Sequence, residues 1–355
     1  MKSIAESGKQ VLPAPTVAVD EYAELKKSIK QAGLLDKHPH LYTWRIILTL
    51  IALFASLLTL VLIKNLWFQL GNALFLAIVF AQIGFLGHDA GHRQGFVTPW
   101  KNDLAGLLLG NLLLGMSQTW WVDKHNQHHS HPNQLDLDPD LDIPGISFNP
   151  HIASQKRGFA RWIMLHQIWL FFPLLTLVSL GLNRSSVKFL LKGRKYSRYW
   201  VVEVMLLLAH WVWLPLLLVA SLGFWQALLF FAINQGFLGF ILGSAFAPNH
   251  KGMPVLEKES RLGFLHRQVI TSRNIHAGIL TDFWYGGLNY QIEHHLFPTM
   301  PRHHLRAAQS LVKRFCRERH IPYIETSILG SYRAILQALD EISSAQHQQQ
   351  ASLGK

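Results

Sequence analysis

The stretch RIILTLIALFASLLTLVLI, residues 45–63, carries a single charge, at Arg45. A helix of about twenty such residues crosses the hydrocarbon core of a bilayer, which is about 30 Å thick. Half of the 355 residues are hydrophobic and only 15% are charged, whereas soluble domains average about 25% charged residues. Further long apolar runs occupy residues 66–87, 162–182, 201–221 and 224–247. Five such runs predict an all-α, polytopic integral membrane protein.

Polar segments flank this apolar part of the chain. Residues 1–44 are polar and mixed in charge, lack the pattern of a signal peptide, and predict a mostly flexible cytoplasmic tail. Residues 45–325 form the expected membrane domain. Within residues 300–340, apolar and basic residues alternate at helical spacing and predict a helical cap. Residues 326–355 predict a cytoplasmic C-terminal helix followed by a polar tail.

The net charge of +12 is concentrated between the apolar runs. The positive residues of these loops before residue 200 include Arg93, Lys101, Lys124, Arg184, Lys188, Lys192, Arg194, Lys195 and Arg198. Such loops face the cytoplasm under the positive-inside rule, and they would also attract anionic lipid headgroups or an acidic electron carrier. A polytopic chain makes nucleic acid an implausible partner. Cys316 is the only cysteine, which excludes an internal disulfide or a cysteine-ligated cluster.

Histidines cluster after separate apolar regions, at 88–92, 125–131 and 294–295, and His250 follows the last apolar run. A single site would require all of them to lie on one side of the membrane. The interval from His88 to His250 must therefore contain an even number of crossings.

Two apolar runs are poor candidates for crossing the membrane. The run at 104–116 is too short and predicts an interfacial or re-entrant segment. The run at 162–182 contains Pro173 and precedes a strongly basic loop, so we expect it to lie in the membrane plane or to be re-entrant. Four transmembrane helices remain, in two hairpins, at about 45–64, 66–87, 201–221 and 224–247. Both termini and every histidine cluster then face the cytoplasm.

The clusters have the spacing of ligands on one helix face. HDAGH places His88 and His92 four residues apart, and HNQHH places three imidazoles at positions i, i+3 and i+4. QIEHH repeats the second spacing with Gln291 in place of the first histidine. Each motif alone is as compatible with packed or capping residues, but their combination predicts a metal centre. Imidazole suits Zn, Cu, Fe and Ni, so the spacing does not identify the metal.

The expected ligands are too many for one four-coordinate ion, and they suit two metals of higher coordination. They are His88, His92, His125, His128, His129, His250, His294 and His295, with Gln291 as a further polar contact. No catalytic residue is expected beyond this metal centre.

The three motifs, with the preceding TSRNIHAGILTDFWYGGLN, closely resemble the histidine boxes of membrane fatty acid desaturases. The QxxHH form of the third box is typical of front-end and related acyl desaturases. The likeness extends from about residue 75 to 325. It implies that the eight histidines hold a non-haem di-iron centre, with Gln291 where many relatives have histidine. It also implies O2 as co-substrate, a cis double bond as product, and two electrons from outside.

The same resemblance suggests the partners. The substrate would be a fatty acyl chain, carried by coenzyme A or by a membrane lipid. Many front-end relatives have an N-terminal cytochrome b5-like domain with a His-Pro-Gly-Gly motif, which this sequence lacks. Electrons are therefore expected from a separate ferredoxin or cytochrome b5 with its reductase.

Neighbours of the boxes are candidates for supporting roles. Asp89, Asn249 and Glu293 stand beside ligands and could orient imidazoles, or in the case of Asn249 hold a water. Trp284, Tyr285 and Gly286 are candidates for the border of an apolar substrate tunnel. The alternative for Asp89 and Glu293 is that they are solvent-facing polar residues of a helix, and ordinary packing is the alternative for the tunnel candidates.

Two other functions remain open at this point. A di-iron hydroxylase or epoxygenase shares the histidine boxes of the superfamily. A polytopic metal transporter or metal-binding protein would also use histidines, but it predicts ligands within the bilayer rather than at one aqueous face.

Overall fold

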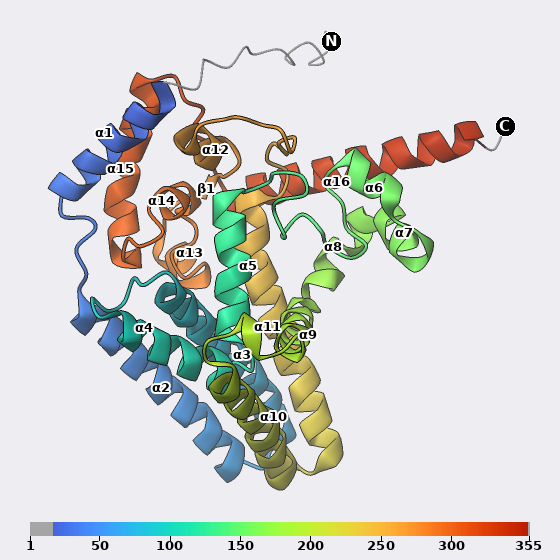
Figure 1. Cartoon of the computed structure of the whole chain (residues 1–355). Helices are drawn as coiled ribbons and strands as arrows, with labels where there is room; N and C mark the ends of the chain where they lie inside the picture. The colour runs from blue at the N-terminus through green and yellow to red at the C-terminus, as the bar shows by residue number, and fades with distance from the viewer. Residues whose placement is uncertain (1–16, 354–355) are drawn as a thin grey trace.

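The computed structural model describes residues 17–353, and within this part of the chain almost all regular structure is helical. The exception is a parallel pair of two-residue strands, β1 (Asn274–Ile275) and β2 (Glu325–Thr326). This agrees with the predicted all-α class. Figure 1 shows a bundle of long helices at the bottom and a group of shorter helices above it.

Four helices are long and apolar enough to cross a membrane. They are α2 (Pro39–Leu62), α3 (Leu66–Gly91), α10 (Trp200–Leu222) and α11 (Phe224–His250). They form the two predicted hairpins, α2–α3 and α10–α11, and their positions confirm the four predicted spans.

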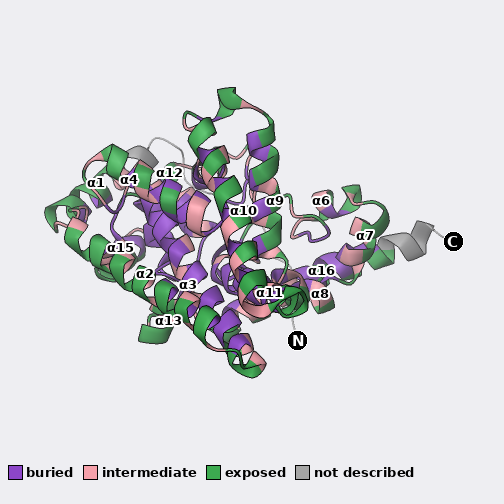
Figure 2. Cartoon of the chain, turned by 90° about the horizontal axis from the view of Figure 1, so that it is seen from below, coloured by how far each residue is buried: buried purple, intermediate pink, exposed green. Residues whose placement is uncertain are grey.

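The two hairpins pack through their second helices. In the most apolar windows of α3 and α11, 61% and 56% of the residues are buried, against 17% in α2 and 22% in α10. Figure 2 shows the same division, with buried residues between the helices and exposed residues on the outer faces. The exposed faces are apolar because lipid, rather than water, surrounds them. The inner helices α3 and α11 therefore hold the side chains at their ends in fixed positions.

The run at 162–182 is not one straight helix. It is divided among α7 (Gly158–Leu165), α8 (Gln167–Leu175) and α9 (Val178–Leu191), and α8 and α9 meet at an angle of 72°. The bend follows Pro173, which cannot donate to the helical ladder. That this segment does not cross the membrane stays a prediction.

The short run at 104–116 begins in α4 (Pro99–Gly106) and continues as the wider π-helix η2 (Leu107–Leu113). Helix α5 (Gln118–Ser130) follows and rises toward the upper group of helices (Figure 1). The 3-10 turn η3 (Arg194–Tyr196) precedes α10.

The upper group forms a helical cap that is larger than the one predicted within residues 300–340, because helices before residue 300 also belong to it. It contains α12 (Phe264–Ile270), α13 (Ile279–Trp284), α14 (Gln291–Leu296) and α15 (Arg302–Glu318). The β1–β2 pair joins the segment before α13 to the segment after α15. The last helix, α16 (Ile328–Leu353), extends to the right of Figure 1 beside α6 (Pro150–Gln155) and α7.

The prediction of a mostly flexible N-terminal tail was wrong for part of residues 1–44. Residues 1–16 lie outside the described residues, but Val17–Gln31 form helix α1. Leu25 and Ile29 of α1 are buried in the core of the cap, and the Tyr22 hydroxyl donates to the Leu296 carbonyl at 2.9 Å. Apolar residues on one face of an otherwise polar helix explain this docking.

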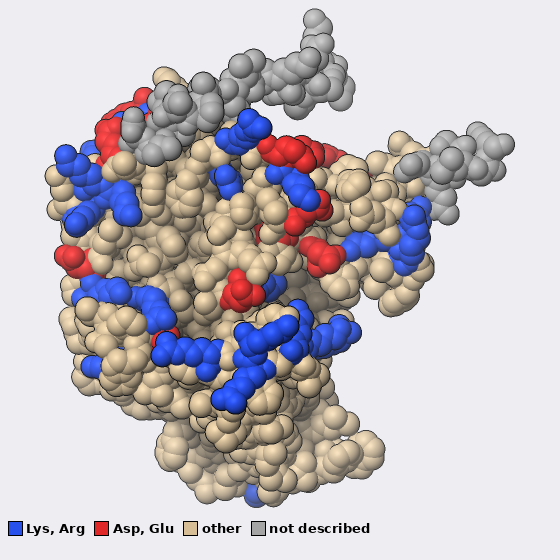
Figure 3. Space-filling view, in the orientation of Figure 1, with Lys and Arg blue, Asp and Glu red and all other residues tan. Residues whose placement is uncertain are grey.

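Charged side chains are unevenly distributed over the surface. In Figure 3, the lower bundle is almost free of Lys, Arg, Asp and Glu, and a band of Lys and Arg crosses the molecule just above it. This pattern is typical of an apolar bundle embedded in a bilayer with cationic side chains at headgroup level.

A buried carboxylate fixes the start of α5. Glu203, in the first turn of α10, is fully buried. Its Oε1 accepts hydrogen bonds from the Ser117 hydroxyl at 2.8 Å and the Thr119 main-chain nitrogen at 3.0 Å, and its Oε2 accepts one from the Ser197 hydroxyl at 2.6 Å. Ser117 is also the N-cap of α5. The positive end of the α5 dipole further favours the carboxylate.

Replacing Glu203 with Ala should destabilise the protein by about 1–3 kcal/mol, because buried donors would lose their acceptor. The measurement is the midpoint of thermal unfolding of the protein purified in detergent. The exposed Glu259, substituted in the same way, is the control. An unchanged midpoint for Glu203→Ala would show that this carboxylate does not hold α5.

Candidate metal centre

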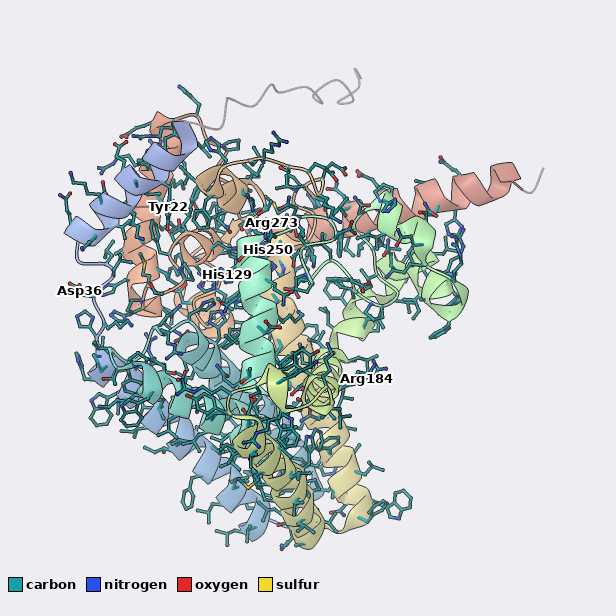
Figure 4. All side chains as sticks on the ribbon, viewed as in Figure 1. Tyr22, Asp36, His129, Arg184, His250 and Arg273 are labelled. Atoms are coloured by element: carbon teal, nitrogen blue, oxygen red, sulfur yellow. The ribbon has the colours of Figure 1, made fainter. Side chains whose placement is uncertain are left out.

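The eight predicted histidines converge at the junction of the bundle and the cap. His88 and His92 lie at the end of α3, the HNQHH residues lie on α5, His250 ends α11, and the QIEHH residues form most of α14. Figure 4 labels His129 and His250, which lie where α5, α11 and α14 come together. The histidine clusters therefore meet in one place, as the hypothesis of a single site requires.

The imidazoles form two adjacent groups with metal-ligand spacing. His88, His92, His125 and His294 offer ring nitrogens that all lie within 4.8 Å of one another. His128, His250 and His295 form a second group that meets the same limit.

His129 stands between the two groups. Its ring is stacked on His295 with 4.1 Å between centroids, and its centroid lies 4.7 Å from that of His294. Its Nε2 lies 3.1 Å from Nε2 of His125. A ring that contacts both groups suits a centre of two neighbouring metals rather than two independent sites.

Each imidazole of the second group is oriented through its Nδ1. His128 Nδ1 is 3.0 Å from both carboxylate oxygens of Asp138. His250 Nδ1 donates to the main-chain carbonyl of Thr271 at 3.0 Å, and His295 Nδ1 donates to Gln268 Oε1 at 2.9 Å. A proton held on Nδ1 leaves the lone pair on Nε2. The three Nε2 atoms then face a common point.

Several ring nitrogens are buried without a hydrogen-bond partner in the described chain. They are His88 Nε2, His92 Nε2, His129 Nδ1, both nitrogens of His294, and His295 Nε2. Each such atom costs about 1–3 kcal/mol when nothing compensates for lost water. Metal coordination provides that compensation, so the residues present fit the expected metal centre.

Protonation would oppose metal binding here, and the surroundings disfavour protonation of His129, His294 and His295. Burial, and then the neighbouring imidazoles, lower the pKa of His129, His294 and His295 well below the usual value. Burial also lowers the pKa of His128, but the Asp138 carboxylate outweighs this effect and raises it. Rings that favour the neutral form therefore lie near His128, whose Nδ1 contacts the Asp138 carboxylate.

Gln291 contacts the second group. Its side-chain Nε2 lies 2.9 Å from His250 Nε2, and its Oε1 accepts a hydrogen bond of 3.1 Å from Asn249 Nδ2. Asn249 is itself fixed by donating to the carbonyls of Ala245 and Leu288, each at 3.0 Å. In this arrangement the amide nitrogen of Gln291, rather than its oxygen, faces the imidazoles. Asn249 thus orients Gln291, and no contact between Asn249 and an imidazole is present among the described hydrogen bonds.

The two acidic candidates have different environments. Asp89 lies 3.5 Å from His88 Nδ1 and forms a buried ion pair with Arg302, with 2.5 Å between Asp89 Oδ2 and Arg302 Nε. Glu293 is fully buried but accepts hydrogen bonds from Asn274 Nδ2 at 2.6 Å and the Tyr323 hydroxyl at 2.8 Å. The prediction that Glu293 orients an imidazole was therefore wrong, because its partners belong to the cap.

The tunnel candidates are held by specific packing. Trp284 Nε1 donates to the Ser244 hydroxyl at 3.0 Å, and Tyr285 is buried. Gly286 has a φ of +59°, and a Cβ at this position would lie 2.3 Å from Cγ of Phe85. These contacts give each residue a structural role. An apolar groove of about 490 Å³ lies elsewhere, between α2, α4 and η2, so a tunnel bordered by residues 284–286 stays a prediction.

Asp138, Gln268 and Thr271, which orient the second group, were not predicted from the sequence. Asp138 lies in the acidic run DLDPDLD at 136–142, shortly after the second histidine box. Carboxylates so close to metal-ligating histidines were a usable signal. Gln268 had no comparable signal, because its partners His129 and His295 are distant in sequence.

Comparisons with known proteins agree with this geometry. A family model described as fatty acid desaturase matches residues 65–327. The chain is 32% identical over 353 residues to the acyl-lipid (9-3)-desaturase of Physcomitrium patens, covering 97% of this chain and 66% of that protein. It is 31% identical over 338 residues to a Delta(6)-fatty-acid desaturase of Caenorhabditis elegans, covering 92% and 75%. It is also 30% identical over 316 residues to a Delta(8)-fatty-acid desaturase of Arabidopsis thaliana, covering 85% and 70%. The chain thus spans about two thirds to three quarters of these relatives.

Substituting Asp138 with Asn should lower the metal affinity by about 10–100-fold, because His128 would lose the anion that holds its proton on Nδ1. Metal retained during dialysis against chelators of graded strength measures this effect. Asp142→Asn, at a highly exposed carboxylate of the same acidic run, is the matched control. Equal retention by both variants would contradict the assigned role of Asp138.

Proposed function

The chain belongs to the fatty acid desaturase family, whose members are oxidoreductases of fatty acyl chains, and we propose that it introduces a cis double bond at a di-iron centre. The observation that supports this most directly is the pair of adjacent imidazole groups joined by His129. The substrate is an acyl chain of a membrane lipid or of acyl-coenzyme A. The names of the relatives, which include acyl-lipid and Delta(6) desaturases, support this class of substrate.

The bound irons would supply the activation of O2, with two external electrons, for removal of one hydrogen from each of two adjacent methylenes and release of water. The residues of the chain hold and orient the metals. His88, His92, His125 and His294 would hold one ion, His128, His250 and His295 would hold the other, and His129 lies within reach of both. Asp138, Gln268 and the Thr271 carbonyl keep the second group in its ligating tautomer.

The position of the centre fits a reaction between a lipid and an aqueous reductant. The ligands of α3 and α11 lie at the ends of the two inner spans, where the apolar bundle meets the cap. An acyl chain can approach from the bilayer, while the cap and its polar surface face water. We propose that this side is cytoplasmic, in agreement with the positive-inside rule and with the band of Lys and Arg in Figure 3.

The electron donor is a separate protein in this proposal, either a ferredoxin or a cytochrome b5 with its reductase. An acidic surface on such a carrier would be complementary in charge to the cationic band. Methylene groups have no polar atom that a protein could bind. The position of the double bond must therefore depend on the shape of an apolar tunnel. Trp284 and Tyr285 border that tunnel in this proposal.

Replacing His129 or His294 with Ala should abolish the unsaturated product while the protein remains in the membrane. The measurement is the fatty acid profile of a desaturase-lacking host by mass spectrometry, with the exposed His151→Ala as control. Wild-type protein should contain about two irons per chain, and each ligand variant fewer. A product that gains oxygen instead of losing two hydrogens would indicate a hydroxylase or epoxygenase. Full activity of either ligand variant would refute the site.

Replacing Gln291 with His should change the rate of desaturation without abolishing it, since an imidazole there can add a ligand beside His250. Gln291→Ala removes the contact with His250 Nε2 at 2.9 Å. The pair is compared by iron content and by product formed per iron. If both variants match the wild type in both quantities, Gln291 has no part in the centre.

A further inference from the structure

Three histidines outside the desaturase centre form another cluster. His38 precedes α2, and His303 and His304 lie in the first turn of α15. Each offers a ring nitrogen, and these three atoms lie within 4.8 Å of one another. The segment before α2 and the start of α15 are more than 260 residues apart in sequence, so the cluster exists only in the folded protein.

One pair of ring nitrogens in the cluster lies at the separation expected for two ligands of one ion. His38 Nδ1 and His303 Nε2 are 3.1 Å apart. Two nitrogens at the usual zinc distance of about 2.0–2.1 Å and a tetrahedral angle would be about 3.3 Å apart. The rings of His303 and His304 have centroids 4.1 Å apart, and the His38 and His304 centroids are 5.2 Å apart. The remaining nitrogen–nitrogen distances, which are at most 4.8 Å, would shorten toward this value when an ion binds.

His304 has a buried ring nitrogen that could bind a metal. The main-chain carbonyl of Asp36 accepts a hydrogen bond from the His304 ring. The Nε2 atom of this ring is buried and has no hydrogen-bond partner in the part of the chain that the structure describes. The proton is thus kept on Nδ1, which is the arrangement found for metal-ligating imidazoles whose other nitrogen bonds a carbonyl. Figure 4 labels Asp36, in the segment between α1 and α2.

The charges around the cluster permit a cation. Burial, then His304, Arg45 and His38, lower the pKa of His303 to about 4, while Asp89 opposes this shift. Burial and His38 also lower the pKa of His304, against the effect of Asp36. Both shifts favour the neutral form of His303 and His304, which is the form that binds a metal. Arg45 and Arg302 are cations close to the cluster, and Asp36 and Asp89 are the nearby anions.

We propose that His38, His303 and His304 bind one divalent transition-metal ion of the Zn²⁺ class, at a site separate from the desaturase centre. All three side chains are partly exposed, so a fourth position is open to solvent and the ion can exchange. The site goes beyond the proposed desaturase function, because none of its ligands belongs to the two groups described above.

Binding at this site would connect the N-terminal segment to the frame of the desaturase centre. Arg302, adjacent to His303, forms the ion pair with Asp89 and donates to the Phe85 carbonyl at 2.5 Å. Asp89 in turn lies beside His88. A metal that holds the first turn of α15 to the start of α2 therefore also restrains the contact between α15 and the end of α3.

The test is a titration of the iron-loaded, full-length protein with Co²⁺, in which the visible absorption of the bound ion is measured. Zn²⁺ is then added to compete for the same site. Wild type and His151→Ala should bind one further equivalent beyond the iron. His38→Ala and His303→Ala should bind it at least about tenfold more weakly. His38→Gln keeps a side chain of about the volume of histidine, and it should bind the ion as weakly as His38→Ala does.

Iron is measured in every sample before and after the titration, so that exchange at the desaturase centre is distinguished from binding at the new site. The proposal requires unchanged iron together with loss of the extra equivalent in the variants. It is overturned if wild-type protein binds no further ion, or if the His38 and His303 variants bind it as tightly as wild type does.

Discussion

Eight imidazoles can share one small volume only while they are neutral and direct lone pairs toward a common centre. Charged rings at these distances would repel one another in a site with little water. The surrounding structure meets this requirement from outside, with an acceptor behind each ring of the second group: the Asp138 carboxylate, the Gln268 amide oxygen and the Thr271 carbonyl. The cap and the loops around it therefore place hydrogen-bond acceptors beside the helices that carry the ligands.

The membrane constrains the form of the segments that carry ligands to the centre. Every main-chain polar group within the bilayer must be satisfied locally, so the part of the chain that reaches the centre from the bilayer side has to be helical. The two buried helices α3 and α11 bring ligands from that side, whereas α5 and α14 bring them from above. Glu203 connects the bundle to a helix that carries ligands from above, because it lies on the membrane helix α10 and fixes the start of α5.

Features with a short-range signal could be predicted from the sequence. Hydropathy gave the apolar runs, and the requirement that all histidine clusters lie on one side of the membrane selected four of them as spans. The i, i+3, i+4 spacing gave the ligand faces. Interactions between distant segments could not be predicted in this way. The docking of α1 depends on a surface formed by α12, α14 and α15, and the burial of Glu293 depends on Asn274 and Tyr323. No pattern near Glu293 distinguishes a carboxylate that faces a metal from one that faces the cap.

Gly286 illustrates how such a framework affects the interpretation of genetic data. Its positive φ and its contact with Phe85 leave no room for any side chain. A library of substitutions scored only by product formed would rank this glycine beside the histidine ligands, although it contributes no atom to the chemistry. Scoring the same library for protein present in the membrane separates the two classes, since a lost ligand spares the fold and a side chain at Gly286 does not.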